Sequence, residues 1–151
     1  MGLFVNRAFA EWEIGDAIPD LGEFELSGDV PELKGKVTYM DFWASWCAPC
    51  RKAFPKVNVL YQKYKDNGFQ VLAVGVDANR RAMDAFLEKS KPTFVTVHDS
   101  KQKLAANTGL DKMPTSYLID EKGIIRFIHE GWRGKKSEAE LEAHILELLG
   151  E

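Results

Sequence analysis

The stretch Asp41-Phe-Trp-Ala-Ser-Trp-Cys-Ala-Pro-Cys50 decides the fold, because it joins a predicted strand to a predicted helix. Residues 36–42 are apolar, aromatic or β-branched on both faces, which is typical of a central strand covered on both sides. Residues 48–65 place apolar side chains three or four positions apart, which predicts an amphipathic helix. The two cysteines therefore lie at the start of a helix that follows a central strand.

The rest of the chain continues this alternation of strands and helices. We expect further strands at residues 24–26, 69–76, 94–97, 115–119 and 124–129, and further helices at 80–89, 101–106 and 138–149. A turn at residues 121–123 makes the last two strands a hairpin. This order predicts an α/β fold in which a mixed central sheet is sandwiched by helices.

Length and composition indicate one globular domain. The 151 residues suffice for a single hydrophobic core. We expect a flexible arm over residues 1–16 and one domain over residues 17–151, acting as a monomer. A net charge of −3 gives no reason to expect a nucleic-acid partner. The longest strongly apolar run, residues 71–76, is far shorter than a membrane span.

The N-terminal arm carries a small-x-small pattern, Ala8-Phe9-Ala10, of the kind that signal peptidases cleave. The basic and long apolar regions that precede such a site in a secretory signal are missing. Two interpretations stay open: the tail of a secretory signal behind an added Met1-Gly2, or an unstructured arm.

Cys47 and Cys50, the two cysteines of the chain, are three positions apart. They cannot connect distant parts of a fold, which excludes a structural disulfide framework. A zinc site needs four ligands, and the three histidines show no matching spacing. A c-type haem site needs histidine directly after the second cysteine, where this chain has Arg51. No metal site is therefore predicted, and a redox dithiol is favoured.

A helix N-terminus suits a redox pair, because its unpaired N–H groups and its dipole favour an anion such as a thiolate. We expect Cys47, at the mouth of the helix, to attack a substrate disulfide. Cys50, one turn inside, then resolves the mixed disulfide. Pro49 restricts the loop between them, Ala48 keeps it small, and Trp46 offers an aromatic platform beside the sulfur.

The segment from Asp41 to Cys50, together with Met113-Pro114-Thr115 before a strand, resembles the thioredoxin superfamily. The extra segment at about residues 78–108 is similar to that of the TlpA/ResA-like group, bacterial thioredoxin-like proteins usually secreted or tethered outside the cytoplasm. The resemblance covers roughly residues 17–149. It implies a thioredoxin fold with an N-terminal strand extension and a central helix–strand insertion.

The resemblance implies roles for several positions. Cys47 and Cys50 match the nucleophile and the resolving cysteine. Pro114 matches the cis-proline that faces the cysteines, and the backbone beside it at Met113 pairs with an extended substrate. Gly131 matches a position in the last hairpin that helps to form the substrate groove.

Asp41 matches the buried acid beneath the cysteines of thioredoxins. Alternation along the strand agrees, since it puts this carboxylate on the same face as Val37 and Tyr39. Burying a carboxyl is costly without a purpose, and accepting the proton of Cys50 is such a purpose. TlpA/ResA-like proteins often have an uncharged residue here and a glutamate where this chain has Ala53. The cytochrome-maturation role that goes with the glutamate is therefore not carried over.

The expected activity is the reduction or exchange of disulfides in protein substrates, with the cysteine disulfide as the redox group and no other cofactor. The implied electron donor is another thiol–disulfide protein, such as a membrane thiol transporter, and the implied compartment is extracytoplasmic or periplasmic. The alternatives are a cytoplasmic thioredoxin-like reductant, a peroxiredoxin-like thiol peroxidase and a non-enzymatic copper carrier. The peroxidase needs a threonine where Ala44 stands, and the carrier needs a soft ligand such as His129 near the cysteines.

Overall fold

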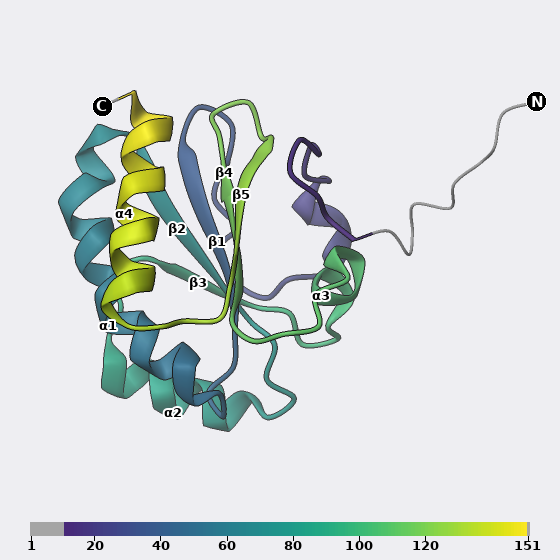
Figure 1. Ribbon diagram of the computed structural model, residues 1–151. Coiled ribbons are helices and arrows are strands. Elements are labelled where there is room, and N and C mark those ends of the chain that lie inside the picture. The colour runs from purple at the N-terminus through teal and green to yellow at the C-terminus, as the bar shows by residue number, and fades with distance from the viewer. Residues whose placement is uncertain (1–10, 151) are drawn as a thin grey trace, which may run out of the picture.

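The computed structural model describes residues 11–150, which contain a five-stranded sheet in the order β3-β2-β1-β4-β5 (Figure 1). The strands are β1 (Val37–Trp43), β2 (Phe69–Gly75), β3 (Val95–His98), β4 (Thr115–Ile119) and β5 (Ile125–Glu130). β2 runs parallel to β1 and to β3, whereas β4 runs antiparallel to β1 and to β5. The predicted mixed sheet is confirmed, with β1 at its centre.

Helices cover both faces of this sheet. In the described part of the chain they are α1 (Ala48–Tyr64), α2 (Arg80–Ser90), α3 (Lys103–Thr108) and α4 (Lys135–Leu149). Helices α1 and α4 lie side by side on one face, and α3 lies on the other with the N-terminal segment (Figure 1). α2 joins the face of α1, where the Phe86 ring contacts the rings of Trp43 and Phe54.

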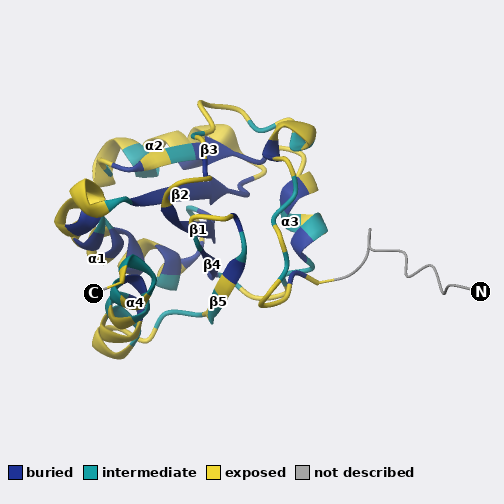
Figure 2. Cartoon of the chain, turned by 90° about the horizontal axis from the view of Figure 1, so that it is seen from above, coloured by how far each residue is buried: buried dark blue, intermediate teal, exposed yellow. Residues whose placement is uncertain are grey.

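The central strands are apolar on both sides because both sides are covered. Every residue of β1 and β2 is buried, and the strands form a buried layer between the helices (Figure 2). Trp43 packs on Phe54 of α1, with ring centroids 4.5 Å apart. Phe42, one residue earlier, packs on Trp12 at the opposite face. Alternation along β1 therefore puts Asp41 on the same face as Trp43, under α1.

Two local features determine where α2 begins and how closely it packs against β2. Asn79 caps the helix by accepting the Ala82 backbone N–H at 3.2 Å. Gly75, at the end of β2, allows the helix to approach closely, because a Cβ there would lie 2.6 Å from Sδ of Met83. The carboxyl end of β2 is thereby held tightly against α2.

The predicted strand at residues 24–26 is wrong. Leu21–Phe24 forms a 3-10 helix instead, and Glu25 adopts a φ of 55°, which interrupts an extended chain. In the described residues the expected N-terminal strand extension is reduced to two isolated antiparallel bridges, Ala17 with Ile124 and Ser27 with His98 of β3. The central insertion forms α2, β3 and α3 as expected, with α3 beginning at Lys103 rather than at residue 101. α4 begins three residues earlier than predicted.

The segment before residue 17 packs against the domain from Glu11 onward. The Trp12 backbone N–H donates to the Thr108 carbonyl, and Nε1 of Trp12 donates to Oδ1 of Asn107, both at 2.9 Å. The expected boundary at residue 17 thus falls inside a packed segment. The small-x-small pattern at residues 8–10 lies outside the described residues. No described helix is long and apolar enough to span a membrane.

Candidate active site

Cys47 and Cys50 form a disulfide at the N-terminus of α1, with Cα atoms 5.2 Å apart. Cys47 is the N-cap of this helix, and its Sγ accepts a hydrogen bond from the Cys50 backbone N–H at 3.3 Å. Pro49 lies in the first turn, where a missing N–H leaves no helical bond unmade. A thiolate at Cys47 would therefore have one N–H donor and the positive end of the helix dipole beside it.

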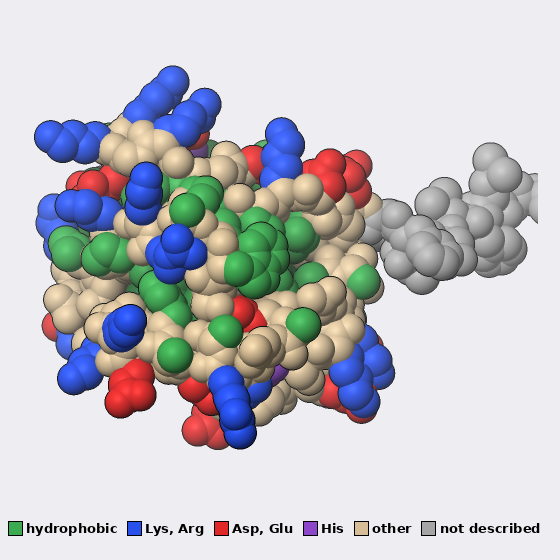
Figure 3. Space-filling view, turned by 90° about the horizontal axis from the view of Figure 1, so that it is seen from below, with side chains coloured by type: hydrophobic (Ala, Val, Ile, Leu, Met, Phe, Trp, Pro, Cys, Tyr) green, Lys and Arg blue, Asp and Glu red, His purple; other side chains and the backbone are tan. Residues whose placement is uncertain are grey.

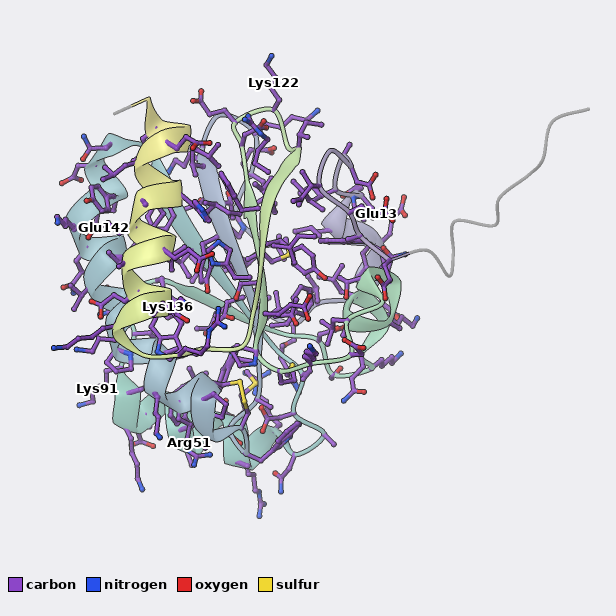
Figure 4. All side chains as sticks on the ribbon, viewed as in Figure 1. Glu13, Arg51, Lys91, Lys122, Lys136 and Glu142 are labelled. Carbon is purple, nitrogen blue, oxygen red and sulfur yellow. A yellow bond between two sulfur atoms is a disulfide. The ribbon has the colours of Figure 1, made fainter. Side chains whose placement is uncertain are left out.

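The two sulfurs differ in access. Cys47 is 5% exposed and Cys50 is fully buried, so a reacting partner meets Cys47 first. Trp46 is 67% exposed beside the pair, Ala48 is exposed and Pro49 is partly buried. The sequence predicts an exposed attacking cysteine at the mouth of the helix, and Cys47 is more covered than that in the disulfide form. The disulfide lies at the same end of the molecule as Arg51 (Figure 4).

The loop before β4 lies beside the end of β1, from which the chain continues to the disulfide. Phe42 pairs with Thr115 across the antiparallel strands β1 and β4, so the residues after β1 lie beside those before β4. The Met113–Pro114 peptide bond is cis, as expected. The Gly131 backbone N–H donates to the Pro114 carbonyl at 2.8 Å. Met113, Pro114 and Gly131 are thus gathered in one loop cluster.

Asp41 is a buried acid on the face of β1 under α1, and 3% of it is exposed. The Ser116 hydroxyl donates to its Oδ1 at 2.8 Å. Burial raises the pKa of Asp41 from 3.8 to about 7, and the hydrogen bond from Ser116 opposes this rise. Burial, and then the charge of Asp41, raise the pKa of the neighbouring Tyr39. An acid that titrates near neutral pH can both accept and return a proton.

A second buried acid, Asp77, anchors the loop between β1 and the disulfide. Its Oδ1 accepts the Ser45 backbone N–H at 3.0 Å, and its Oδ2 accepts the Ser45 hydroxyl at 2.5 Å. Nη1 of Arg51 donates to the Ser45 carbonyl at 2.8 Å, which ties the loop to α1 as well. Neither Ser45 nor Asp77 is predicted as a site residue. The available signal is the place of Asp77 directly after a buried strand, since neighbouring parallel strands end at one edge of a sheet.

The histidine named in the copper-carrier alternative is engaged elsewhere. Nε2 of His129 lies 3.1 Å from Nδ1 of His144, and the His144 ring stacks on Phe127 with centroids 3.8 Å apart. Burial, together with His144, lowers the pKa of His129 to about 4. Within residues 11–150, no three His, Cys, Asp or Glu side chains gather as a metal site. These contacts give the copper-carrier alternative no support.

The chain resembles known proteins in both sequence and structure. The family model described as Redoxin matches residues 14–145. The thiol-disulfide oxidoreductase ResA of Bacillus thuringiensis (strain Al Hakam) is 31% identical over 147 residues, which cover 95% of this chain and 82% of the relative. A Chlorobium tepidum structure assigned as the thiol:disulfide interchange protein DsbE is 41% identical with a TM-score of 0.85, covering 93% of this chain and 100% of the other. StoA from Bacillus subtilis is 30% identical with a TM-score of 0.64, covering 73% and 82%.

The mixed sheet, the helix-capping disulfide and these relatives define a thioredoxin-fold thiol–disulfide oxidoreductase. The chain belongs to the Redoxin family and is a ResA-like member of the thioredoxin superfamily. Its substrates are disulfides of proteins, as for other thiol–disulfide oxidoreductases. The ResA and DsbE relatives are named for thiol–disulfide oxidoreduction and interchange, and they lend no support to the peroxidase alternative.

Proposed function

We propose that the protein works as a reductase of disulfides in protein substrates. The observation that carries this proposal is the hydrogen bond from the Cys50 N–H to Sγ of Cys47, at the N-terminus of the 17-residue helix α1. That environment favours a thiolate at Cys47, the species that attacks disulfides. The Cys47–Cys50 pair is the redox group, and no other cofactor takes part.

The reaction runs through a mixed disulfide. The Cys47 thiolate attacks one substrate sulfur, so that a Cys47–substrate bond forms and the substrate disulfide breaks. The second substrate sulfur leaves as a thiolate and takes up a proton. Cys50 then loses its proton and attacks Sγ of Cys47, which closes the protein disulfide and releases the first substrate sulfur as a thiol. Two electrons and two protons pass from the protein dithiol to the substrate.

Asp41 accepts the proton of Cys50 in the second step. Its carboxyl group lies on the face of β1 that α1 covers, and α1 carries Cys50. A pKa raised by burial to about 7 lets this carboxyl take a proton from a thiol more readily than an ordinary aspartate does. Asp41 is therefore proposed as the proton acceptor for resolution.

The substrate binds over the disulfide, between the helix N-terminus and the cis-proline loop. The backbone at Met113, beside Pro114, pairs with an extended segment of the substrate in this proposal, as the resemblance to the thioredoxin superfamily implies. The Gly131 N–H is already bonded to the Pro114 carbonyl, which leaves the hairpin to form one wall of the surface. The contact residues proposed are Trp46, Ala48, Pro49, Met113, Pro114 and Gly131.

The proposed setting of the reaction is extracytoplasmic. The resemblance to ResA and to the interchange protein assigned as DsbE supports this compartment. A second thiol–disulfide protein, for instance a membrane thiol transporter, returns the protein to its dithiol form. The chain acts as a monomer in this proposal.

A trapping experiment tests the reductase function. The Cys50→Ala variant should accumulate a mixed disulfide between Cys47 and insulin, because no thiol remains to resolve it. Non-reducing electrophoresis and mass spectrometry detect the adduct, and Cys47→Ala is the matched control that should form none. If no adduct forms and the wild type does not reduce insulin in the presence of dithiothreitol, the proposal is wrong.

The direction of the reaction has its own test, a redox titration of the cysteine pair against glutathione buffers. A potential near the thioredoxin value of about −270 mV supports net reduction of substrates. A potential near about −120 mV, as in a strong oxidant, would reverse the proposed direction while leaving the exchange chemistry in place.

A further inference from the structure

A groove of about 640 Å³ runs between α1 and α2 and opens beside the loop that leads into the disulfide. Its volume is within the range of sites that hold small ligands or several side chains of a partner. Two helix faces form its walls, and on each face the lining residues repeat at spacings of three and four. The residues that matter here are Arg51 and Phe54 on α1, and Ala82, Ala85, Phe86 and Lys89 on α2.

The groove has an apolar floor with open space above it. The rings of Phe54 and Phe86 lie 5.2 Å apart and pack on buried Trp43 beneath them. Ala82 and Ala85 are exposed, and because their side chains are small they leave space on the α2 side of the groove. Phe54 is only 1% exposed, so an apolar side chain of a partner can rest on the partly exposed ring of Phe86 and on the exposed Pro55.

The charged side chains that line the groove are positive, although the whole chain carries a net charge of −3. The charged residues that line the groove, Arg51 and Lys89, are both cations, and α1 contains four cations and no carboxylate. The two carboxylates of α2, Asp84 and Glu88, do not line the groove, and Asp84 pairs with Arg80. Arg51 is held in place by its bond to the Ser45 carbonyl and keeps further N–H donors free for a carboxylate. Hydrophobic side chains are exposed at this end of the molecule, with Lys and Arg side chains and some Asp and Glu side chains around them (Figure 3).

The two cations at the groove stand at its opposite ends. Asn58 accepts the Thr93 backbone N–H at 2.8 Å, which places the end of α2, where Lys89 lies, beside Asn58. Arg51 precedes Asn58 by seven helical positions, a rise of about 10 Å. An extended chain covers about 13 Å in four residues, and its residues i, i+2 and i+4 point to the same face. Two carboxylates four positions apart, with an apolar residue midway between them, would therefore face both cations, whose long side chains take up the remaining difference in length.

We propose that this groove binds an acidic segment of the protein whose disulfide is reduced, an inference that rests on the reductase function above. One carboxylate of the segment pairs with Arg51 beside the disulfide, an apolar side chain lies on Phe86 and Pro55, and a second carboxylate pairs with Lys89. The groove thereby selects substrates by the sequence that flanks their cysteine.

Three synthetic disulfide peptides test this proposal. They share one disulfide and one central leucine, and they carry at the two matching positions either glutamates, glutamines or lysines. The second-order rate constant of the reduced protein with each peptide is measured by the change in tryptophan fluorescence. Bis(2-hydroxyethyl) disulfide, a small neutral substrate that does not reach the groove, reports on the cysteines alone.

The wild type should prefer the glutamate peptide, and added salt should weaken the preference. Lys89→Glu should lower the rate with the glutamate peptide about fivefold, since it replaces one exposed attraction by a repulsion. Its rate with the glutamine peptide and with the small disulfide should stay unchanged. Lys122→Glu, with the same charge change at the opposite end of the molecule, is the matched control (Figure 4).

A second variant tests the apolar floor. Ala85→Trp fills the groove and should slow all three peptides but not the small disulfide, whereas Ala143→Trp on the exposed side of α4 should change none of these rates. Equal effects of Lys89→Glu and Lys122→Glu, or no preference for the glutamate peptide, would overturn the groove proposal. Failure of the wild type with both insulin and the small disulfide would instead overturn the reductase function.

Discussion

Asp41 and Asp77 are two buried carboxyl groups beside the same disulfide loop, and their surroundings differ. Asp41 lies within β1 and accepts one hydrogen bond, from the Ser116 hydroxyl. Asp77 follows β2 and accepts two, from the backbone N–H and the hydroxyl of Ser45. One hydrogen bond offsets little of the cost of burying the Asp41 carboxyl, whereas both oxygens of Asp77 accept a hydrogen bond. The comparison teaches that donors at both oxygens let a buried carboxyl hold a loop, whereas burial with a single donor raises the pKa of Asp41.

The largest expected effect is on the stability of Asp41→Asn. Because the folded-state pKa of Asp41 is raised to about 7 from 3.8, the native state holds this proton more tightly than the unfolded chain. The wild type therefore loses stability as the pH rises from about 4 to about 7. The variant lacks this loss, and its free energy of unfolding should exceed that of the wild type by up to roughly 4 kcal/mol at pH 8. Urea titrations at pH 4 and pH 8 measure the gain, and the same difference at both pH values would contradict it.

The same variant should slow the second chemical step. Without a carboxylate to take the proton of Cys50, resolution of the mixed disulfide should fall about 100-fold at pH 7, the usual contribution of a positioned base. Attack by Cys47 on the substrate should change far less. Stopped-flow fluorescence from exposed Trp46 separates the two steps. Equal slowing of both would remove Asp41 from the role of proton acceptor.

Asp77→Ala should act on stability in the opposite direction. The change leaves the Ser45 N–H and hydroxyl without their buried partner, which should lower the free energy of unfolding by about 2 kcal/mol. Guanidinium unfolding at pH 7 measures this loss. Asp77→Asn, which keeps one acceptor oxygen, should lose about half as much. A variant as stable as the wild type would show that the loop does not depend on this anchor.

The smallest effect is expected from Ser116→Ala. The Ser116 hydroxyl holds the pKa of Asp41 down, so its removal should raise that pKa further, by about one unit. The pH midpoint of the resolution step should move upward by the same amount. Ser137→Ala, which removes a surface hydroxyl bonded to the Arg133 N–H, is the control. An unmoved midpoint would mean that another group titrates.

Most of the fold follows from patterns that neighbouring residues carry. The β4 prediction, residues 115–119, agrees with the structure at both ends, and α1 agrees within one residue, because its cap and its apolar spacing are local. The prediction of a strand at residues 24–26 is wrong for a local reason that the sequence does not reveal. Glu25 takes a left-handed conformation that the composition of the segment does not announce.

The site also has a part that short motifs predict and a part that depends on tertiary contacts. The cysteine pair and the cis-proline loop lie within short motifs, so they can be found in the sequence. Ser45 and Asp77 are 32 positions apart and meet because β1 and β2 are neighbouring parallel strands. The groove between α1 and α2 also depends on the way in which two helices pack on one face of the sheet, which no local pattern encodes.

The sequence by itself determined the chemistry of this protein: two thiols three positions apart at the start of a helix, with a proline loop to face them. The tertiary structure decided that Asp41 has a pKa near 7. Asp41 receives its one donor from Ser116, 75 positions away, through the antiparallel pairing of β1 and β4. A pKa depends on the water excluded from a carboxyl group and on the donors aimed at it. Both are properties of the packed sheet, and a sequence of side chains does not contain them until the strands are paired.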